Sequence, residues 1–209
     1  MEPILNNWTI CQLGLWNTRI FTAHWLAKEL FDSKQVIMEV PMQSVLPFRF
    51  TCEEIIVIPH DQQIVIGMKN TSQETLLKAE KIAIRILELL PHTPFNAFGI
   101  NFGFIEQDPR KELLSIFSLV DNCEIITKDY EIKNTDVKRS LNIDGGTLNL
   151  THSFENDKSA VKIHFNYHYE TESASAACSI MRSKVNTCFE HATTFLKNVY
   201  GLEIDAEVN

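Results

Sequence analysis

The alternation of apolar and small residues is clearest near the middle of the chain, between Pro91 and Pro109. Large apolar side chains stand at every second position, and small or polar residues stand between them. The two registers are Phe98, Ile100, Phe102, Phe104 and Ala97, Gly99, Asn101, Gly103. Period-two alternation predicts a central strand with one face in the core. Because glycine within a strand often marks close approach by another backbone, we expect the small register to line an open sheet face that accepts a protein segment or another subunit.

Apolar spacing also predicts the elements that precede this strand. A first strand is expected over 8–15 and a helix over 19–31, with Thr18 as its N-cap. Short strands are expected over 35–40, 49–52, 54–58 and 63–68. A long helix over 71–90 follows, where Asn70 or Thr71 can cap the first turn and Thr71-x-x-Glu74 fits a capping box.

After the central strand the pattern predicts a second series of elements. Asp108 followed by Pro109 indicates a helix start, and that helix is expected to end near Val120. Four strands are expected over 124–133, 137–143, 147–154 and 161–169, with a tight turn at 144–146. Residues 170–179 are small and polar and are typical of a linker. A last helix is expected over 180–200, with Gly201 ending it.

The predicted elements repeat one order: strand, helix, four strands, long helix. We expect a first α+β half over 1–92, a second over 93–201 and a frayed acidic tail over 202–209, with both halves in one continuous sheet. The predicted fold class is α+β: a curved antiparallel sheet with two long helices on one face, built from a pseudo-duplicated unit. This order is similar to the saddle of the TATA-box-binding protein fold, and it also resembles helix-grip folds. The resemblance covers element order alone, so it implies a fold and no activity.

Composition and charge narrow the functional classes. The chain has 209 residues and a net charge of −8, which argues against a general affinity for nucleic acid or anionic membranes. The sequence shows neither a secretory signal nor an apolar run long enough to span a bilayer. Five scattered cysteines without a C-x-x-C pair indicate reduced thiols. We therefore expect a cytoplasmic protein without a metal ion or cofactor, with a protein partner or self-association.

The segment 161–170 alternates as cleanly as the central strand. Its polar register holds Lys162, His164, Asn166 and His168. Two histidines four apart in a strand lie about 13 Å from each other, too far to share one metal ion. This register is either a solvated face or a polar recognition surface. Together with the central strand it defines the predicted partner or ligand face: Asn101, Gly99, Gly103, Lys162, His164, Asn166 and His168.

Other chemistry-bearing residues form weaker patterns. Cys188 and His191 are three apart on the last predicted helix, where they could form a nucleophile pair, but Cys188 falls on the apolar stripe. A basic stripe of Lys78, Lys81 and Arg85 on the long helix is either a solvated face or a site for an acidic partner.

These observations favour a non-catalytic binding or assembly protein that engages a protein partner through an open sheet face or groove. Two alternatives stay open. One is a small-molecule binder with a groove between the sheet and a long helix. The other is an enzyme with a scattered site, which a cluster of His152, His164 and His168 with a carboxylate would indicate.

Overall fold

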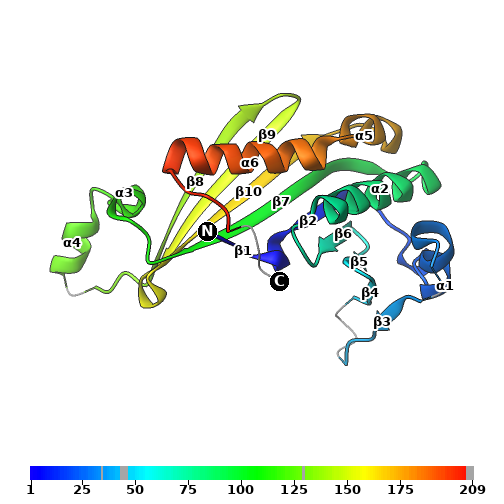
Figure 1. Ribbon diagram of the computed structural model, residues 1–209, viewed down its shortest axis with the longest axis horizontal. Helices are drawn as coiled ribbons and strands as arrows, with labels where there is room; N and C mark the ends of the chain where they lie inside the picture. The colour runs from blue at the N-terminus through cyan, green and yellow to red at the C-terminus, as the bar shows by residue number, and fades with distance from the viewer. Residues whose placement is uncertain (34, 43–46, 129, 206–209) are drawn as a thin grey trace.

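A computed structural model describes residues 1–33, 35–42, 47–128 and 130–205. Within these ranges the chain forms one ten-stranded antiparallel sheet and six α-helices (Figure 1). The predicted α+β class and the antiparallel sheet are therefore confirmed.

The central strands of the sheet are antiparallel neighbours that lie far apart in sequence. The strands are β1 Glu2–Pro3, β2 Thr9–Gly14, β3 Ile37–Glu39, β4 Arg49–Cys52, β5 Ile55–Pro59, β6 Gln63–Met68, β7 Phe95–Gln107, β8 Asn134–Ile143, β9 Gly146–Glu155 and β10 Ala160–Glu170. Their order is β3-β4-β5-β6-β2-β7-β10-β9-β8, and β1 pairs with β7 beside β2. The pair β2–β7 thus lies between two runs of strands.

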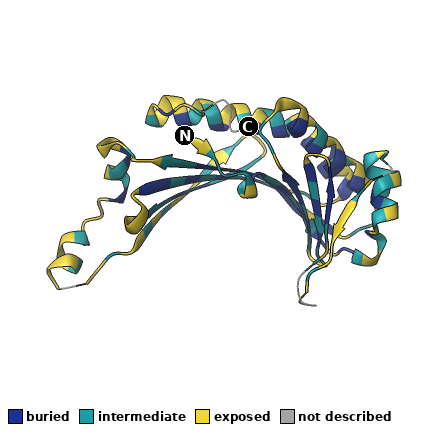
Figure 2. Cartoon of the chain, turned by 60° about the horizontal axis from the view of Figure 1, so that its bottom comes forward, coloured by how far each residue is buried: buried dark blue, intermediate teal, exposed yellow. Residues whose placement is uncertain are grey.

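The long helices α2 (Gln73–Leu89) and α6 (Lys184–Tyr200) lie on the same side of the sheet (Figure 1). The sheet arches, and the helices follow the upper, convex side in the orientation of Figure 2. The shorter helices are α1 (Ala23–Leu26), α3 (Lys111–Leu114), α4 (Asn122–Thr127) and α5 (Ala174–Met181). No described helix covers the lower side of the sheet in this view.

The alternation of β7 determines which side becomes the core. Phe98, Phe102 and Phe104 are fully buried under the helices. The ring of Trp8 lies edge-on to Phe102, with centroids 5.1 Å apart, and contacts Phe189 of α6 at 5.3 Å. Its indole Nε1 donates a hydrogen bond to the carbonyl oxygen of Gly103 at 3.0 Å. The helix-facing register of the central strand is therefore the middle of the aromatic core.

The two long helices begin differently from the prediction. Ser72, rather than Asn70 or Thr71, caps α2: its hydroxyl accepts a hydrogen bond from the Thr75 N–H at 3.2 Å. The predicted last helix is two helices, because Ser183 adopts a left-handed backbone (φ +61°) between α5 and α6. The linker prediction for 170–179 is wrong over 174–179, where Ala174 and Ala177 are fully buried. Small side chains there allow close packing rather than flexibility.

Three other predictions fail where short apolar runs are ambiguous. The strand expected over 124–133 is wrong, because α4 occupies Asn122–Thr127; its Ile126 is 61% exposed. The helix expected from Asp108 to Val120 is reduced to α3 and a 3₁₀ turn at Ser115–Phe117, and Arg110 rather than Asp108 takes the N-cap position. The helix expected over 19–31 is likewise divided into a 3₁₀ turn (Thr18–Ile20), α1 and a π-helical turn (Ala27–Phe31).

The C-terminal segment is anchored as far as it is described. Leu202 is buried, and the N-terminal ammonium of Met1 donates a hydrogen bond to the Glu203 carbonyl at 2.8 Å. The Asp205 N–H donates in turn to the Met1 carbonyl at 3.0 Å. The prediction of a frayed tail over 202–209 is therefore wrong for 202–205, while 206–209 lie outside the described residues.

Candidate functional site

The predicted partner face lies on the side of the sheet opposite the long helices, which we call the helix-free face. Strand register places its residues in rows that run across the strands. Asn166 of β10 stands directly opposite Asn101 of β7 on one side and Asn149 of β9 on the other. His164 lies opposite Gly103, and His168 lies opposite Gly99. Residues predicted from two separate strands are thus neighbours.

A continuous chain of side-chain hydrogen bonds crosses five strands of this face. We call it the amide row: Ser140, Asn149, Asn166, Asn101 and Thr9. The Ser140 hydroxyl donates to Asn149 Oδ1 (2.8 Å), Asn149 Nδ2 to Asn166 Oδ1 (3.0 Å), Asn166 Nδ2 to Asn101 Oδ1 (2.7 Å) and Asn101 Nδ2 to Thr9 Oγ1 (3.0 Å). Each amide both donates and accepts a hydrogen bond, so neighbouring side chains fix one another's orientation and the row is rigid.

Sequence reasoning identified two members of the amide row and missed three. Thr9, Asn149 and Ser140 each occupy the polar register of their own strand, which is a signal visible in sequence. Their alignment depends on the register between strands, and no local pattern specifies it.

Charged and titratable groups on the helix-free face are partly neutralised. Lys162 forms an ion pair with Glu155, and Lys158 and Lys162 together lower the pKa of Glu155 to about 2. Burial lowers the pKa of His164 below its ordinary value, which favours the neutral imidazole at neutral pH. Among the described residues, no three His, Cys, Asp or Glu side chains are placed to hold a metal ion.

The other half of the helix-free face is aliphatic. Four half-buried aliphatic side chains project from this part of the face: Leu13 of β2, Ile56 and Ile58 of β5, and Val65 of β6. Ile56, Ile58 and Val65 line a hollow of about 300 Å³ that Thr9 of the amide row also borders. Arg49 and Lys69 border the same hollow. The face therefore has a mainly aliphatic half with basic residues at its border, and a polar half, which meet at β2.

The small-residue register of β7 lies on this face, but the chain itself covers much of it. A Cβ added to Gly103 would lie 2.7 Å from Asn7 Cβ, because the 3₁₀ turn Leu5–Asn7 occupies the space above that residue. A Cβ at Gly99 would lie 3.1 Å from Asn166 Nδ2. Asn101 is 8% exposed. A partner would therefore meet the side chains around these residues rather than Gly103 itself.

Cys188 and His191 are held by two tyrosines instead of by each other. The Cys188 thiol lies 3.3 Å from the Tyr169 hydroxyl, and His191 Nδ1 lies 2.8 Å from the Tyr167 hydroxyl. Burial raises the pKa of Cys188 to about 11, so the thiol is protonated at neutral pH and is a poor nucleophile. This geometry gives no support to a Cys/His nucleophile pair.

The three histidines that would have indicated an enzyme do not cluster. His152 stands opposite Ile163 of β10 and faces the helices, whereas His164 and His168 face the opposite side of the sheet. The His152 side chain is fully buried, and neither ring nitrogen has a hydrogen-bond partner of normal geometry among the described residues. Burial, with the nearby Arg139 charge, lowers its pKa to about 4.

The predicted basic stripe on α2 is neutralised in part. Lys78 forms an ion pair with Glu53, and Arg85 lies 3.9 Å from a Glu29 carboxylate oxygen and 3.8 Å from one of Glu88. Exposed pairs of this kind contribute little to stability, but they balance the local charge.

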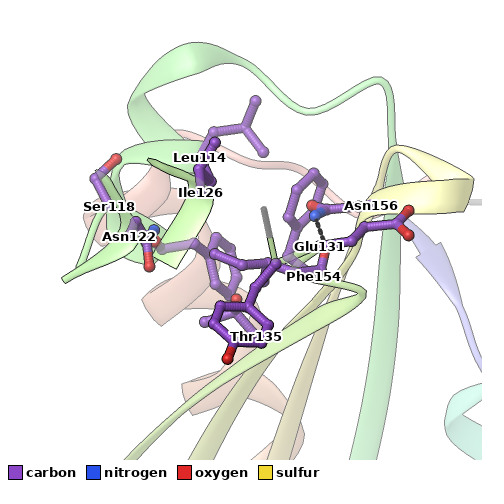
Figure 3. Close-up of a pocket in the computed structure, with 11 residues that line it drawn as sticks. Leu114, Ser118, Asn122, Ile126, Glu131, Thr135, Phe154 and Asn156 are labelled. Carbon is purple, nitrogen blue, oxygen red and sulfur yellow. Dashed lines mark hydrogen bonds between the residues drawn. The ribbon is translucent and has the colours of Figure 1, made fainter. Parts of the chain in front are cut away.

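A pocket of about 620 Å³ lies at the far end of the sheet, between the α3–α4 segment and strands β8 and β9 (Figure 3). Phe117 and Phe154 contact each other there, with ring centroids 5.5 Å apart. Asn156 donates a side-chain hydrogen bond to the Ile132 carbonyl at the rim. The site is separate from the interface between the sheet and α6, which core aromatic side chains fill.

No protein-family model matches the chain, and no curated protein matches its sequence. Across the described ranges, every helix is too short or too polar to cross a lipid bilayer.

Proposed function

We propose that this is a non-catalytic binding or assembly protein that engages a protein partner through the helix-free face. The observation that carries the proposal is the division of that face into an aliphatic half and a polar half joined at Thr9. Protein–protein interfaces combine apolar area with polar groups that form hydrogen bonds. The rigid amide row offers a preformed surface, which lowers the entropic cost of binding.

The partner of this proposal is a polypeptide segment with one apolar side. Its apolar side chains lie against Ile56, Ile58 and Val65, and its polar groups meet His164, His168 and the amide row. A nucleic acid is a poorer occupant, because Lys162 already pairs with Glu155 and the chain carries a net charge of −8. The protonated Cys188 and the separated histidines likewise give the enzyme alternative no support.

We also propose that residues 1–92 and 93–201 are duplicated halves of a saddle similar to the TATA-box-binding protein fold. The support is the order outward from the central pair: β6, β5 and β4 beside β2, and β10, β9 and β8 beside β7. Each half ends in a long helix, α2 or α6. The five free cysteines support a cytoplasmic location for the proposed protein.

Ile58→Lys tests the proposed partner surface. We expect native mass spectrometry of the wild-type protein, purified gently from its own host, to show a complex with a second polypeptide. A lysine in the aliphatic half should weaken that complex by roughly tenfold or more, because a charge replaces an interface anchor. Thr194→Lys, on the exposed outer side of α6, is the matched control and should leave the complex intact. Equal binding by both variants, at unchanged melting temperature, would refute the proposal.

The pocket of Figure 3 favours a second candidate function, the binding of a small, largely apolar molecule. We expect a discrete low-mass adduct in the same native mass spectra if this function is correct. Ser118→Trp would fill the pocket from its exposed rim and should remove the adduct. An adduct that persists in this variant would place the ligand elsewhere.

A further inference from the structure

The strand β8 is a long outer edge of the sheet. It pairs only with β9 among the described residues, and its pairing runs from Asn134 opposite Glu155 to Ile143 opposite Gly146 without a register shift. The hairpin that it forms rises behind α6 in Figure 1. The other outer strand, β3, has three residues, whereas β8 has ten. A long, regular edge is a template for pairing with a further strand.

Hydrogen-bonding groups of β8 are directed away from the sheet at alternate residues. The loop of β8–β9 has two residues, Asp144 and Gly145, so Ile143 and Gly146 exchange both of their backbone hydrogen bonds. Odd-numbered residues of β8 therefore bond to β9. Even-numbered residues, including Asp136, Lys138 and Ser140, direct their N–H and C=O groups outward.

We propose that β8 pairs with β8 of a second copy of this chain, antiparallel about a two-fold axis at Val137. A two-fold axis normal to the sheet keeps the helices of both copies on one side, so residues that stand opposite each other share a face. In this register Asp136 stands opposite Lys138 of the second copy, and Lys138 opposite its Asp136. Asn134 likewise stands opposite Ser140, and Val137 opposite itself.

The charges of β8 select this partner and this register. Asp136 and Lys138 are both exposed, and neither forms a salt bridge among the described residues. A two-fold axis at Asp136, Lys138 or Arg139 would place that charged side chain directly opposite the same residue of the second copy. The axis at Val137 instead forms two pairs of opposite charge, and directly opposed pairs of this kind stabilise a sheet. Val137 is half-buried on the helix side and adds an apolar contact across the axis.

The oligomeric state of the full chain and its charge variants tests this inference. We expect sedimentation equilibrium to show a concentration-dependent dimer of the wild-type protein. Lys138→Glu places two carboxylate pairs face to face and should weaken the dimer on the order of 10- to 30-fold. Asp136→Lys should act in the same direction. The double variant Asp136→Lys/Lys138→Glu restores both opposite-charge pairs, so its dimer should return to near wild-type affinity.

Each other outcome overturns the inference. A wild-type chain that stays monomeric at the highest attainable concentration has no such pairing. A dimer that is insensitive to Lys138→Glu, or that the double variant does not restore, has another interface or register. The three variants carry their substitutions on an exposed edge. Equal melting temperatures of these variants and the wild type, measured at a concentration where all are monomeric, show that folding is unchanged. The proposed β8 pairing involves neither Ile58 nor the aliphatic half of the helix-free face. This test and the test of the proposed function are therefore independent.

Discussion

Replacing Glu80 with alanine is expected to lower the free energy of unfolding by about 3 kcal/mol. The Glu80 side chain, 8% exposed on α2, accepts hydrogen bonds from the N–H groups of Ser183 (2.9 Å) and Val185 (3.0 Å). Ser183 is the N-cap of α6, but its left-handed backbone leaves its own side chain without a capping bond. Glu80 therefore caps α6 from the other half of the chain. Alanine would leave both N–H groups without a partner. Chemical denaturation at neutral pH measures the loss.

Glu80→Gln is the matched comparison for this prediction. Glutamine keeps one acceptor oxygen and nearly the same shape, so we expect about half of the alanine effect. Glu74→Ala, at an exposed position in the first turn of the same helix, controls for changes in α2 itself and should cost at most about 1 kcal/mol through the lost interaction with the helix dipole. If Glu80→Ala is as mild as Glu74→Ala, the carboxylate does not hold the two helices together.

On acidification, His152 is expected to cost the wild-type protein on the order of 3 kcal/mol in its free energy of unfolding. Replacing His152 with phenylalanine should remove this loss. In the unfolded chain His152 has its ordinary pKa of 6.5, while burial lowers the pKa in the folded state to about 4. Between these values the unfolded state binds a proton that the folded state does not. The stability due to the neutral ring is therefore complete above pH 6.5 and declines as the pH falls toward 4.

The measurement for His152→Phe is the free energy of unfolding at about pH 7.5, 5.5 and 4.5, which runs from above the pKa of the unfolded state to just above that of the folded state. At the highest pH the variant should be more stable by about 1 kcal/mol, because it removes a buried ring whose nitrogens lack partners and keeps the edge contact with Tyr200. His164, whose pKa is also lowered, remains in both proteins and supplies a shared background slope. Identical pH profiles for both proteins would contradict the assignment.

The sequence predicted those parts of the fold whose pattern is long and regular. The alternation of β7 and β10, and the apolar stripe of α2, each cover at least ten residues and match observed elements. The failures are short. The segment 122–127 contains a few apolar residues that fit a strand or a helix equally well, so the pattern does not choose between them. The chain forms a helix there, and no residue of that helix is buried. Likewise, Ser183 ends one helix because of a left-handed backbone that its residue type does not signal.

In the candidate site, too, the local sequence pattern determined some features and the folded chain determined the others. Local alternation by itself determined that Asn101, Asn166, His164 and His168 leave the core, because a strand sends successive side chains to opposite faces. Only the tertiary structure decided that Asn101 and Asn166 are hydrogen-bonded, that Asn149 and Thr9 extend the row, and that Asn7 covers Gly103. The physical reason is that the side of the sheet to which a side chain points is determined within its own strand. Register, burial and capping between α2 and α6 depend on groups far apart in sequence, which only folding brings within bonding distance.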